Sequence, residues 1–392
     1  MPALLSELEE EGFAVPNIEK SNLKAGLELG NLANGKFTGS RDKKIFLVVD
    51  ALGYNLIERI RKERKEAAKM LEKAEITKIH AVFPTTTMTG LTSIYGTMST
   101  AEHGIVGDSL FLKDAGIMIN SIKMSALLSP DELGLNTYNP SLLFPKANIL
   151  NGAKEAGLRI KIAYPKQITR KRGQWTMFHE ENVMPYTVFD EMIVRLRKEI
   201  EKDGCDYIIA YYDILDSLEH LHSYKSEEVL EHLTGMLASI DRNLVPLLKK
   251  KGWNLVITAD HGQICVSNKE RKLVDSNDRF LDFLSMPPWG GGRALFMQAR
   301  EGMDAKFETY FEKNFKDFAV LMDSEEAISA GLFGKKKVDE ALRYRFGTHI
   351  ALAKGLHSIS YVFPGEKPKD YEQLGKHGGL AKDEVEIPLL IY

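Results

Sequence analysis

Short runs of hydrophobic, mainly β-branched residues recur along the chain, and most of them end in a polar or glycine-containing turn followed by helix-like sequence. This alternation is typical of βαβ units around a mostly parallel sheet. We expect strands at residues 44–50, 76–83, 160–165, 206–213, 254–260 and 387–392. Ligands of such sheets bind beyond the carboxyl ends of the strands, so functional residues are expected directly after these runs.

Two segments between the runs, Asn55–Ala74 and Ser226–Lys250, repeat hydrophobic residues at helical spacing and carry charged residues on the remaining face. This pattern predicts solvated helices that pack on the sheet. We assign no chemistry to them.

The pattern changes near residue 281. The segment from there to about residue 370 opens with MPPWGGGR and continues with a strand-like RALFMQA, a helical KFETYFEKNF and a strand-like SISYVF. These elements favour a smaller inserted α/β cap. We therefore expect a catalytic α/β domain over residues 1–280, the cap over residues 281–370, and a return to the catalytic domain over residues 371–392.

Composition narrows the classes of function. The 392 residues are 44% hydrophobic and 27% charged, as in ordinary folded proteins, and a net charge of −3 gives no footprint for binding polymeric nucleic acid. The acidic N-terminus does not resemble a secretory signal, and no apolar run reaches membrane-spanning length, so a cytoplasmic protein without a membrane partner is expected. Cys205 and Cys265 lack metal-site spacing, so a metal would need histidine and carboxylate ligands.

Acidic residues and histidines follow the predicted strands repeatedly. Asp50 follows IFLVV, Asp216 and His220 follow IIAYYD, Asp260 and His261 follow LVITA, and His377 lies in GKHGG before the last run. One aspartate at a strand end is ordinary, because aspartate favours turns and helix caps. Six oxygen and nitrogen ligands at one edge of a sheet instead suit two divalent ions, with three protein ligands each and open positions for substrate.

The local spacing of these residues suits metal binding. Asp216 and His220 are four positions apart, so both side chains would lie on one face of a helix and reach one ion. Asp260 and His261 are adjacent, which in a regular strand would send them to opposite faces. At the end of a strand both side chains can turn toward a metal, and Gly262 permits such a bend.

The segment FPTTTMTG, residues 83–90, raises a further question because it places four threonines in eight positions. Threonine caps helices well, but a cap requires only one hydroxyl. A hydroxyl is also a poor nucleophile until a base or a metal ion helps to remove its proton. The candidate metal ligands elsewhere in the chain could provide that help.

Six motifs occur in one order: VVDALG, FPTTTMTGLTSIYG, EHGIVG, DSLEH, TADHGQ and KHGG. From about Lys44 onward the chain thereby resembles the alkaline phosphatase superfamily, and within it the type I phosphodiesterase/nucleotide pyrophosphatase family. The resemblance implies an alkaline-phosphatase-like, mostly parallel sheet flanked by helices. It implies Asp216, His220 and His377 as ligands of one metal, Asp50, Asp260 and His261 as ligands of the other, and Thr87 as the nucleophile.

The activity that this resemblance implies is hydrolysis of phosphodiester or nucleotide pyrophosphate bonds through a phospho-threonine intermediate. The expected substrate is a small phosphate ester or a nucleotide. The expected cofactors are two divalent ions; histidine and aspartate ligands favour zinc, and manganese fits nearly as well. The alternatives are a phosphomonoesterase or phosphonate hydrolase of the same superfamily, or an inactive scaffold that only binds ligands.

The motifs leave substrate preference open. Where the resemblance implies an asparagine three residues after the nucleophile, the sequence has Gly90, so one phosphoryl-oxygen contact has no assigned partner. Four basic residues are candidates for it, and four aromatic residues could line a pocket for the second substituent of a diester. The basic candidates are Lys166, Arg170, Arg172 and Arg293; the aromatic candidates are Tyr95, Phe111, Tyr212 and Trp289.

Overall fold

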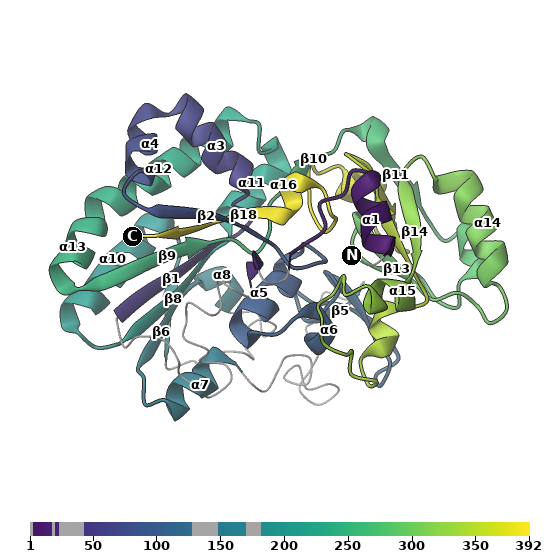
Figure 1. Cartoon of the computed structure of the whole chain (residues 1–392), viewed down its shortest axis with the longest axis horizontal. Helices are drawn as coiled ribbons and strands as arrows, with labels where there is room; N and C mark the ends of the chain where they lie inside the picture. Colours follow the sequence, from purple (N-terminus) through teal and green to yellow (C-terminus); the bar gives the residue numbers. More distant parts are fainter. Residues whose placement is uncertain (1–2, 18–19, 23–42, 128–147, 170–181) are drawn as a thin grey trace.

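A computed structural model describes residues 3–17, 20–22, 43–127, 148–169 and 182–392. Two seven-stranded sheets lie side by side in this structure. The sheet with the longer strands, called the larger sheet below, is on the left of Figure 1, and the second sheet is on the right. All six predicted strands are present in the larger sheet, which confirms the α/β prediction. Three of the basic candidates for the phosphoryl-oxygen contact follow the predicted strand at residues 160–165. Of these, Lys166 is exposed, and Arg170 and Arg172 lie outside the described residues.

The larger sheet is mostly parallel. Neighbouring strands from β9 to β7 run parallel, whereas β18 is antiparallel to both of its neighbours, β2 and β9. In sheet order the strands are β2 (Glu75–His80), β18 (Glu386–Ile391), β9 (Trp253–Thr258), β1 (Lys43–Val49), β8 (Tyr207–Tyr212), β6 (Ile160–Pro165) and β7 (Val183–Tyr186).

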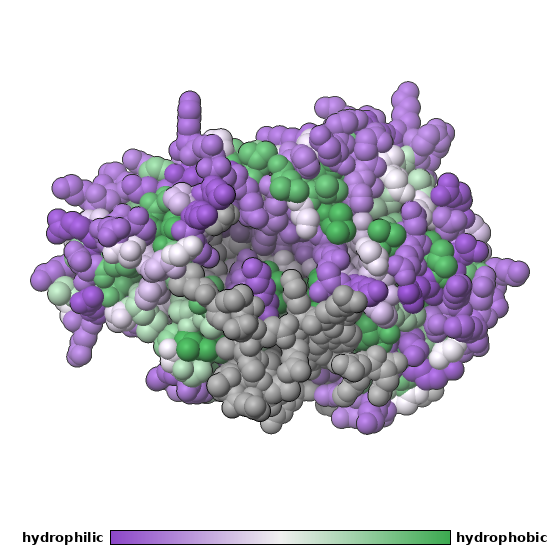
Figure 2. All heavy atoms as spheres, turned by 180° about the vertical axis from the view of Figure 1, so that it is seen from behind, coloured by the Kyte–Doolittle hydropathy of each residue, from purple (hydrophilic) through white to green (hydrophobic). Residues whose placement is uncertain are grey.

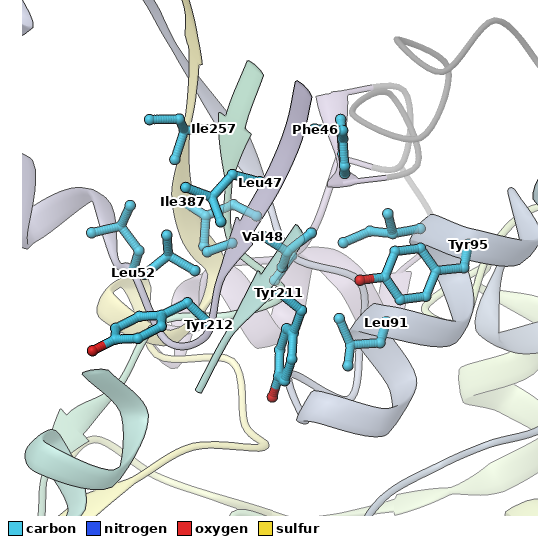
Figure 3. Close-up of a cluster of buried hydrophobic side chains, with 14 of the residues drawn as sticks. Phe46, Leu47, Val48, Leu52, Leu91, Tyr95, Tyr211, Tyr212, Ile257 and Ile387 are labelled. Carbon is cyan, nitrogen blue, oxygen red and sulfur yellow. The ribbon is translucent and has the colours of Figure 1, made fainter. Parts of the chain in front are cut away.

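The central strand β1 is buried on both faces. Its residues alternate between the two sides of the sheet, as the pleat of a strand requires. Figure 3 shows Leu47 on the same side as Ile257 of β9, whereas Phe46 and Val48 face Tyr95 on the other side. Burying each such side chain fully is worth about 1.5–3 kcal/mol, so this core fixes the strand ends that carry the site.

Each of the two predicted helical segments forms two helices. Arg64, with φ −132° and ψ 80°, separates the first pair, α3 and α4. Pro246 ends the other long helix, α12, because proline lacks the N–H of a continuing helix and clashes with the preceding turn. The helices are α1 (Ala3–Glu10), α3 (Tyr54–Glu63), α4 (Lys65–Leu71), α5 (Thr87–Gly96), α6 (Thr100–His103), α7 (Ile149–Glu155), α8 (Lys166–Thr169), α10 (Phe189–Lys202), α11 (Ile214–His222), α12 (Glu227–Asn243), α13 (Val245–Lys251), α14 (Asp304–Phe315), α15 (Ser324–Ser329) and α16 (Lys382–Val385).

The second sheet is antiparallel, and α14 lies at its far side in Figure 1. The strand-like and helical stretches predicted for the cap correspond to β13, α14 and β16. Three strands of this sheet, β3 to β5, come from residues 109–126, so the division of the chain at residues 280 and 370 stays a prediction. The sheet order is β14 (Ala319–Asp323), β15 (His349–Ala353), β13 (Ala294–Met297), β12 (Trp289–Gly290), β3 (Ser109–Leu112), β4 (Ile117–Asn120) and β5 (Ser125–Ala126).

Two small strand pairs form separate two-stranded sheets. An antiparallel pair joins β10 (Ile264–Cys265) to β17 (Gly375–Lys376), and a parallel pair joins β11 (Arg271–Val274) to β16 (Ser358–Tyr361). Among the described residues on the face seen in Figure 2, most are hydrophilic, with hydrophobic residues in small groups between the polar ones. Across the described ranges, every helix is too short or too polar to cross a membrane.

Candidate active site

The ends of β1 and β9 bring three of the predicted ligands together. Asp50 follows β1, Asp260 and His261 follow β9, and all three side chains are buried. Nε2 of His261 lies 3.4 Å from Oδ1 of Asp50 and 3.7 Å from Oδ2 of Asp260. Ala51 has a φ of 62°, which is rare outside glycine, and its N–H donates to Oδ1 of Asp260 at 3.2 Å. The turn after β1 is therefore tied to the end of β9.

The other three predicted ligands come from α11 and from the loop after β17. Asp216 and His220 lie on one face of α11, with Nε2 of His220 3.3 Å from Oδ2 of Asp216. Nε2 of His377 lies 3.8 Å from Oδ1 of the same aspartate. The ring of His377 also stacks on that of His261, with centroids 3.9 Å apart, so the two sets of three residues adjoin.

All three histidines are oriented in the same way. Nδ1 of His220 lies 2.8 Å from the carbonyl oxygen of Gly375, and Nδ1 of His377 lies 3.0 Å from that of Thr85. For His261 the carbonyl is that of Gly262, at 3.2 Å. A carbonyl can only accept, so Nδ1 carries the proton and donates it, which leaves each Nε2 facing the carboxylates as a possible metal ligand.

The carboxylates of the cluster repel one another. Burial raises the pKa of Asp50 well above its usual range, and the charges of Asp260 and Asp216 raise it further. Burial also raises the pKa of Asp260, against the opposing charge of His261. At Asp216 burial acts in the same direction, but the charge and hydrogen bond of His220 outweigh it and hold the pKa below its usual range. A bound cation would stabilise such a cluster of buried carboxylates, because it offsets their mutual repulsion.

Two oxygens of the cluster support this interpretation. Oδ1 of Asp50 and Oδ2 of Asp260 are buried and have no hydrogen-bond partner in the described part of the chain. Burying such an oxygen without a partner is costly, and a metal ion would remove the cost. The possible ligand atoms form two groups, each within 4.8 Å: Asp216, His220 and His377, and Asp50, Asp216 and His261. These residues fit divalent ions, and the assignment of Asp260 to the second ion stays a prediction.

Thr87 is the first residue of α5 and lies beside this cluster. Its hydroxyl is 3.2 Å from Nε2 of His261. The helix begins there because Thr86 has an extended conformation, with φ −119° and ψ 154°. The positive end of the helix dipole therefore lies at Thr87, where it favours an anionic ligand such as a phosphoryl group.

A family model for type I phosphodiesterase/nucleotide pyrophosphatase matches residues 44–380. The chain belongs to this family. The match includes every predicted ligand and Thr87. No curated protein matches the chain significantly.

Solved structures share the fold of this phosphodiesterase-family chain. Murine ectonucleotide pyrophosphatase/phosphodiesterase 5 superposes with a TM-score of 0.66 at 17% identity, covering 89% of this chain and 88% of that chain. An inactive threonine-to-alanine form of that protein in complex with AMP gives a TM-score of 0.65 at 17% identity, covering 90% and 88%. Phosphonoacetate hydrolase from Sinorhizobium meliloti, in complex with phosphonoformate, gives 0.64 at 16% identity and covers 90% of both chains.

Arg293, a predicted candidate for the phosphoryl-oxygen contact, has other partners within this protein. Its guanidinium forms a fully buried ion pair with Glu384 and donates to the carbonyl oxygen of His357. It is therefore not available to a substrate oxygen, and the prediction is wrong for this residue.

The predicted aromatic pocket is also largely wrong. Tyr95, Tyr212 and Trp289 are buried in the hydrophobic core; the two tyrosines are visible there in Figure 3. The indole N–H of Trp289 donates to the carbonyl oxygen of Arg345 at 2.7 Å. Only Phe111 is partly exposed, edge-on to Tyr344 with ring centroids 6.1 Å apart. Core packing accounts for these rings because large aromatic side chains are the largest source of buried area.

Three residues that lie beside the site were not identified from the sequence. The hydroxyl of Tyr211 donates to Oδ2 of Asp50, and the amide of Gln263 donates to Oδ1 of Asp216. Asp108 lines a cavity of about 200 Å³ together with Gly290. Burial raises the pKa of Asp108 to about 6, opposed by the charge of His261. The available signals were the motif edges, because Asp108 follows EHGIVG directly and Gln263 closes TADHGQ.

Proposed function

We propose that this protein hydrolyses phosphodiester or nucleotide pyrophosphate bonds through a covalent intermediate on Thr87. The observation that carries the proposal is the position of the Thr87 hydroxyl, 3.2 Å from Nε2 of His261 at the start of α5. Membership of the type I phosphodiesterase/nucleotide pyrophosphatase family supports the reaction class.

Two divalent ions are part of the proposal. One would be held by Asp216, His220 and His377, and the other by Asp50, Asp260 and His261. When bound, such a pair lowers the pKa of a nearby hydroxyl and neutralises charge on the phosphoryl oxygens. Imidazole and carboxylate ligands suit zinc, and manganese is the alternative.

The chain itself supplies the nucleophile and its orientation. In the first step the Thr87 hydroxyl loses its proton and the Oγ1–P bond forms as the P–O bond to the leaving group breaks; the leaving group is an alcohol for a diester, which takes up that proton, and a phosphate for a nucleotide pyrophosphate. In the second step water cleaves the phospho-threonine and restores the hydroxyl. Burial of Thr87 restricts the water that could compete with its hydroxyl as the nucleophile of the first step, and α5 presents the positive end of its dipole to the phosphoryl group.

The similar structures support two substrate classes. The murine protein has been captured with AMP in an inactive threonine-to-alanine form, which favours a nucleotide substrate and a functional threonine. The hydrolase from Sinorhizobium meliloti has been captured with phosphonoformate, so cleavage of a phosphonate is the second candidate. Both ligands carry a phosphorus group.

A substrate panel tests the proposal. Protein reconstituted with zinc or manganese is assayed with bis-p-nitrophenyl phosphate, a p-nitrophenyl ester of thymidine monophosphate, p-nitrophenyl phosphate and phosphonoacetate. We expect the highest kcat/KM for the two diesters. A clear preference for the monoester or for phosphonoacetate overturns the diesterase assignment. Binding without turnover of any of the four compounds would identify a ligand-binding scaffold.

A further inference from the structure

The loop that carries His377 is held by a buried ion pair between the two sheets. Arg293 directly precedes β13 of the second sheet, and Glu384 lies in α16, which leads into β18 of the larger sheet. Nε of Arg293 donates to Oε1 of Glu384 at 3.0 Å, and Nη2 donates to Oε2 at 2.8 Å. Both side chains are fully buried. This two-point geometry is the strongest form of an arginine–carboxylate pair.

Glu384 also holds the loop backbone. Its Oε1 accepts the N–H of Gly379 at 2.9 Å, and its Oε2 accepts that of Ala381 at 2.8 Å. A Cβ atom at position 379 would lie 2.8 Å from Oε2 of Glu384 and 3.1 Å from Nε of Arg293. The second glycine of the KHGG motif therefore makes room for the ion pair.

The same loop is joined to the segment that leads to Thr87. Besides accepting from Nδ1 of His377 through its carbonyl, Thr85 accepts the N–H of Gly378 through its hydroxyl at 3.0 Å. That hydroxyl in turn donates to the carbonyl oxygen of Gly379 at 2.9 Å. Arg293, Glu384, the loop and Thr85 thus form one continuous chain of hydrogen bonds.

We propose that Arg293 is a positioning residue for His377. It holds Glu384 in place, Glu384 fixes the loop from Gly379 to Ala381, and the loop fixes the imidazole against Thr85. The inference rests on the proposed function in taking His377 as a metal ligand. Without Arg293 the buried carboxylate loses its partner, and a carboxylate left alone in the interior must move toward water or take up a proton.

The expected effect on the two metals is unequal. Among the candidate ligands, only His377 belongs to the loop, and it approaches Asp216 to 3.8 Å. Asp50 and Asp260 follow β1 and β9 and are joined through the turn at Ala51. None of these segments is part of the His377 loop. A change at Arg293 reaches them indirectly, through the stacking of His377 on His261 and through the hydrogen bond that the N–H of Gly262 donates to the carbonyl oxygen of Glu384 at 2.9 Å.

The test compares Arg293→Met with Arg345→Met. Arg345 is also a buried arginine, but it donates to the carbonyl oxygens of His103 and Gly104, away from the loop. Zinc is titrated against a competing chelator, and the imidazole N–H of His377 is followed by NMR of the metal-free protein labelled with ¹⁵N-histidine. For Arg293→Met we expect one ion to bind at least about tenfold more weakly, the other to stay within about twofold, and the His377 signal to shift. Arg345→Met should leave both affinities and the signal unchanged.

Unchanged zinc affinities and an unchanged His377 signal in Arg293→Met would overturn the proposal. If that variant does not fold, Arg293→Lys keeps the charge without the two-point geometry; we expect a smaller, still unequal loss, and wild-type behaviour would contradict us. If the unaltered protein binds neither zinc nor manganese, the proposed function fails, and the NMR signal alone still decides whether Arg293 orients His377.

Discussion

The hydroxyl of Thr87 lies 3.2 Å from Nε2 of His261, and the neighbouring threonines of FPTTTMTG have other partners. The hydroxyl of Thr86 lies 2.9 Å from that of Thr89, which donates to the carbonyl oxygen of Ile105. Thr85 is bound to the His377 loop. The four threonines thus divide into one that faces the candidate ligands and three that hold the surrounding backbone.

We predict that Thr87→Ala loses at least about 10³-fold in kcat, because no other hydroxyl of the segment faces the cluster. Thr87→Ser should retain part of the activity, since it keeps the hydroxyl. Zinc content and the unfolding midpoint should stay close to those of the unaltered protein. Thr86→Val is the matched control; if it were inactive while Thr87→Ala turned over normally, the nucleophile would be assigned to the wrong threonine.

Asp216→Asn should weaken the binding of both ions. The carboxylate of Asp216 belongs to both groups of possible ligand atoms, whereas Asp50 belongs to one of them. We therefore expect zinc titration of Asp216→Asn to show two weakened sites, and that of Asp50→Asn to show one strongly weakened site. An Asp216→Asn protein that keeps one site at full affinity would contradict this shared position.

Gly90→Ala should destabilise the protein and reduce turnover. A Cβ atom at position 90 would lie 2.7 Å from Cβ of Asp260 and 2.9 Å from its carbonyl oxygen, so α5 or the end of β9 would have to shift. Gly235, within α12, has open space around it, so Gly235→Ala should stabilise the protein by about 0.5–1 kcal/mol. Urea unfolding of both variants measures the contrast, and equal effects would refute the close approach at Gly90.

His103 should make the protein less stable in mild acid. Burial lowers the pKa of His103 to about 3, with a smaller contribution from Arg345. The folded state therefore disfavours the proton that the unfolded chain takes up below its ordinary pKa, and stability falls as the pH drops from that value toward the folded one. Between about pH 7.5 and pH 5 this contributes about 2 kcal/mol.

The matched variant for this effect is His103→Gln, whose amide can accept from the N–H of Ile105 and donate to Ser93, as the imidazole does. Its urea-unfolding free energy should fall less between the two pH values. Equal losses in the two proteins would show that His103 does not cause the acid sensitivity.

Much of the fold and the candidate site was predictable because both depend on local sequence. The central strands β1, β8 and β9 each contain a run of hydrophobic residues, and Asp50, Asp260 and His261 come just after such runs. His103, in the motif EHGIVG, has both ring nitrogens hydrogen-bonded within the protein.

What the sequence did not reveal depends on partners far away in the chain. Arg293 pairs with Glu384, 91 positions later, so its charge could not be distinguished from one available to substrate. The strands at residues 109–126 are short, and the first of them, β3, pairs with β12, more than 170 positions away. Aromatic residues next to motifs fill the core as readily as they line pockets, and only packing separates the two uses.

The antiparallel strand β18 has a consequence for how the protein is made. It lies between β2 and β9, and the ion pair of Lys78 and Glu386 joins residues 308 positions apart. The ribosome must therefore add about 300 residues after β2 before β18 can pair with it, and until then the growing chain exposes two unpaired strand edges to other chains. His377 emerges only shortly before β18, so the covering of these strand edges and the completion of the candidate ligand cluster occur at nearly the same point of synthesis.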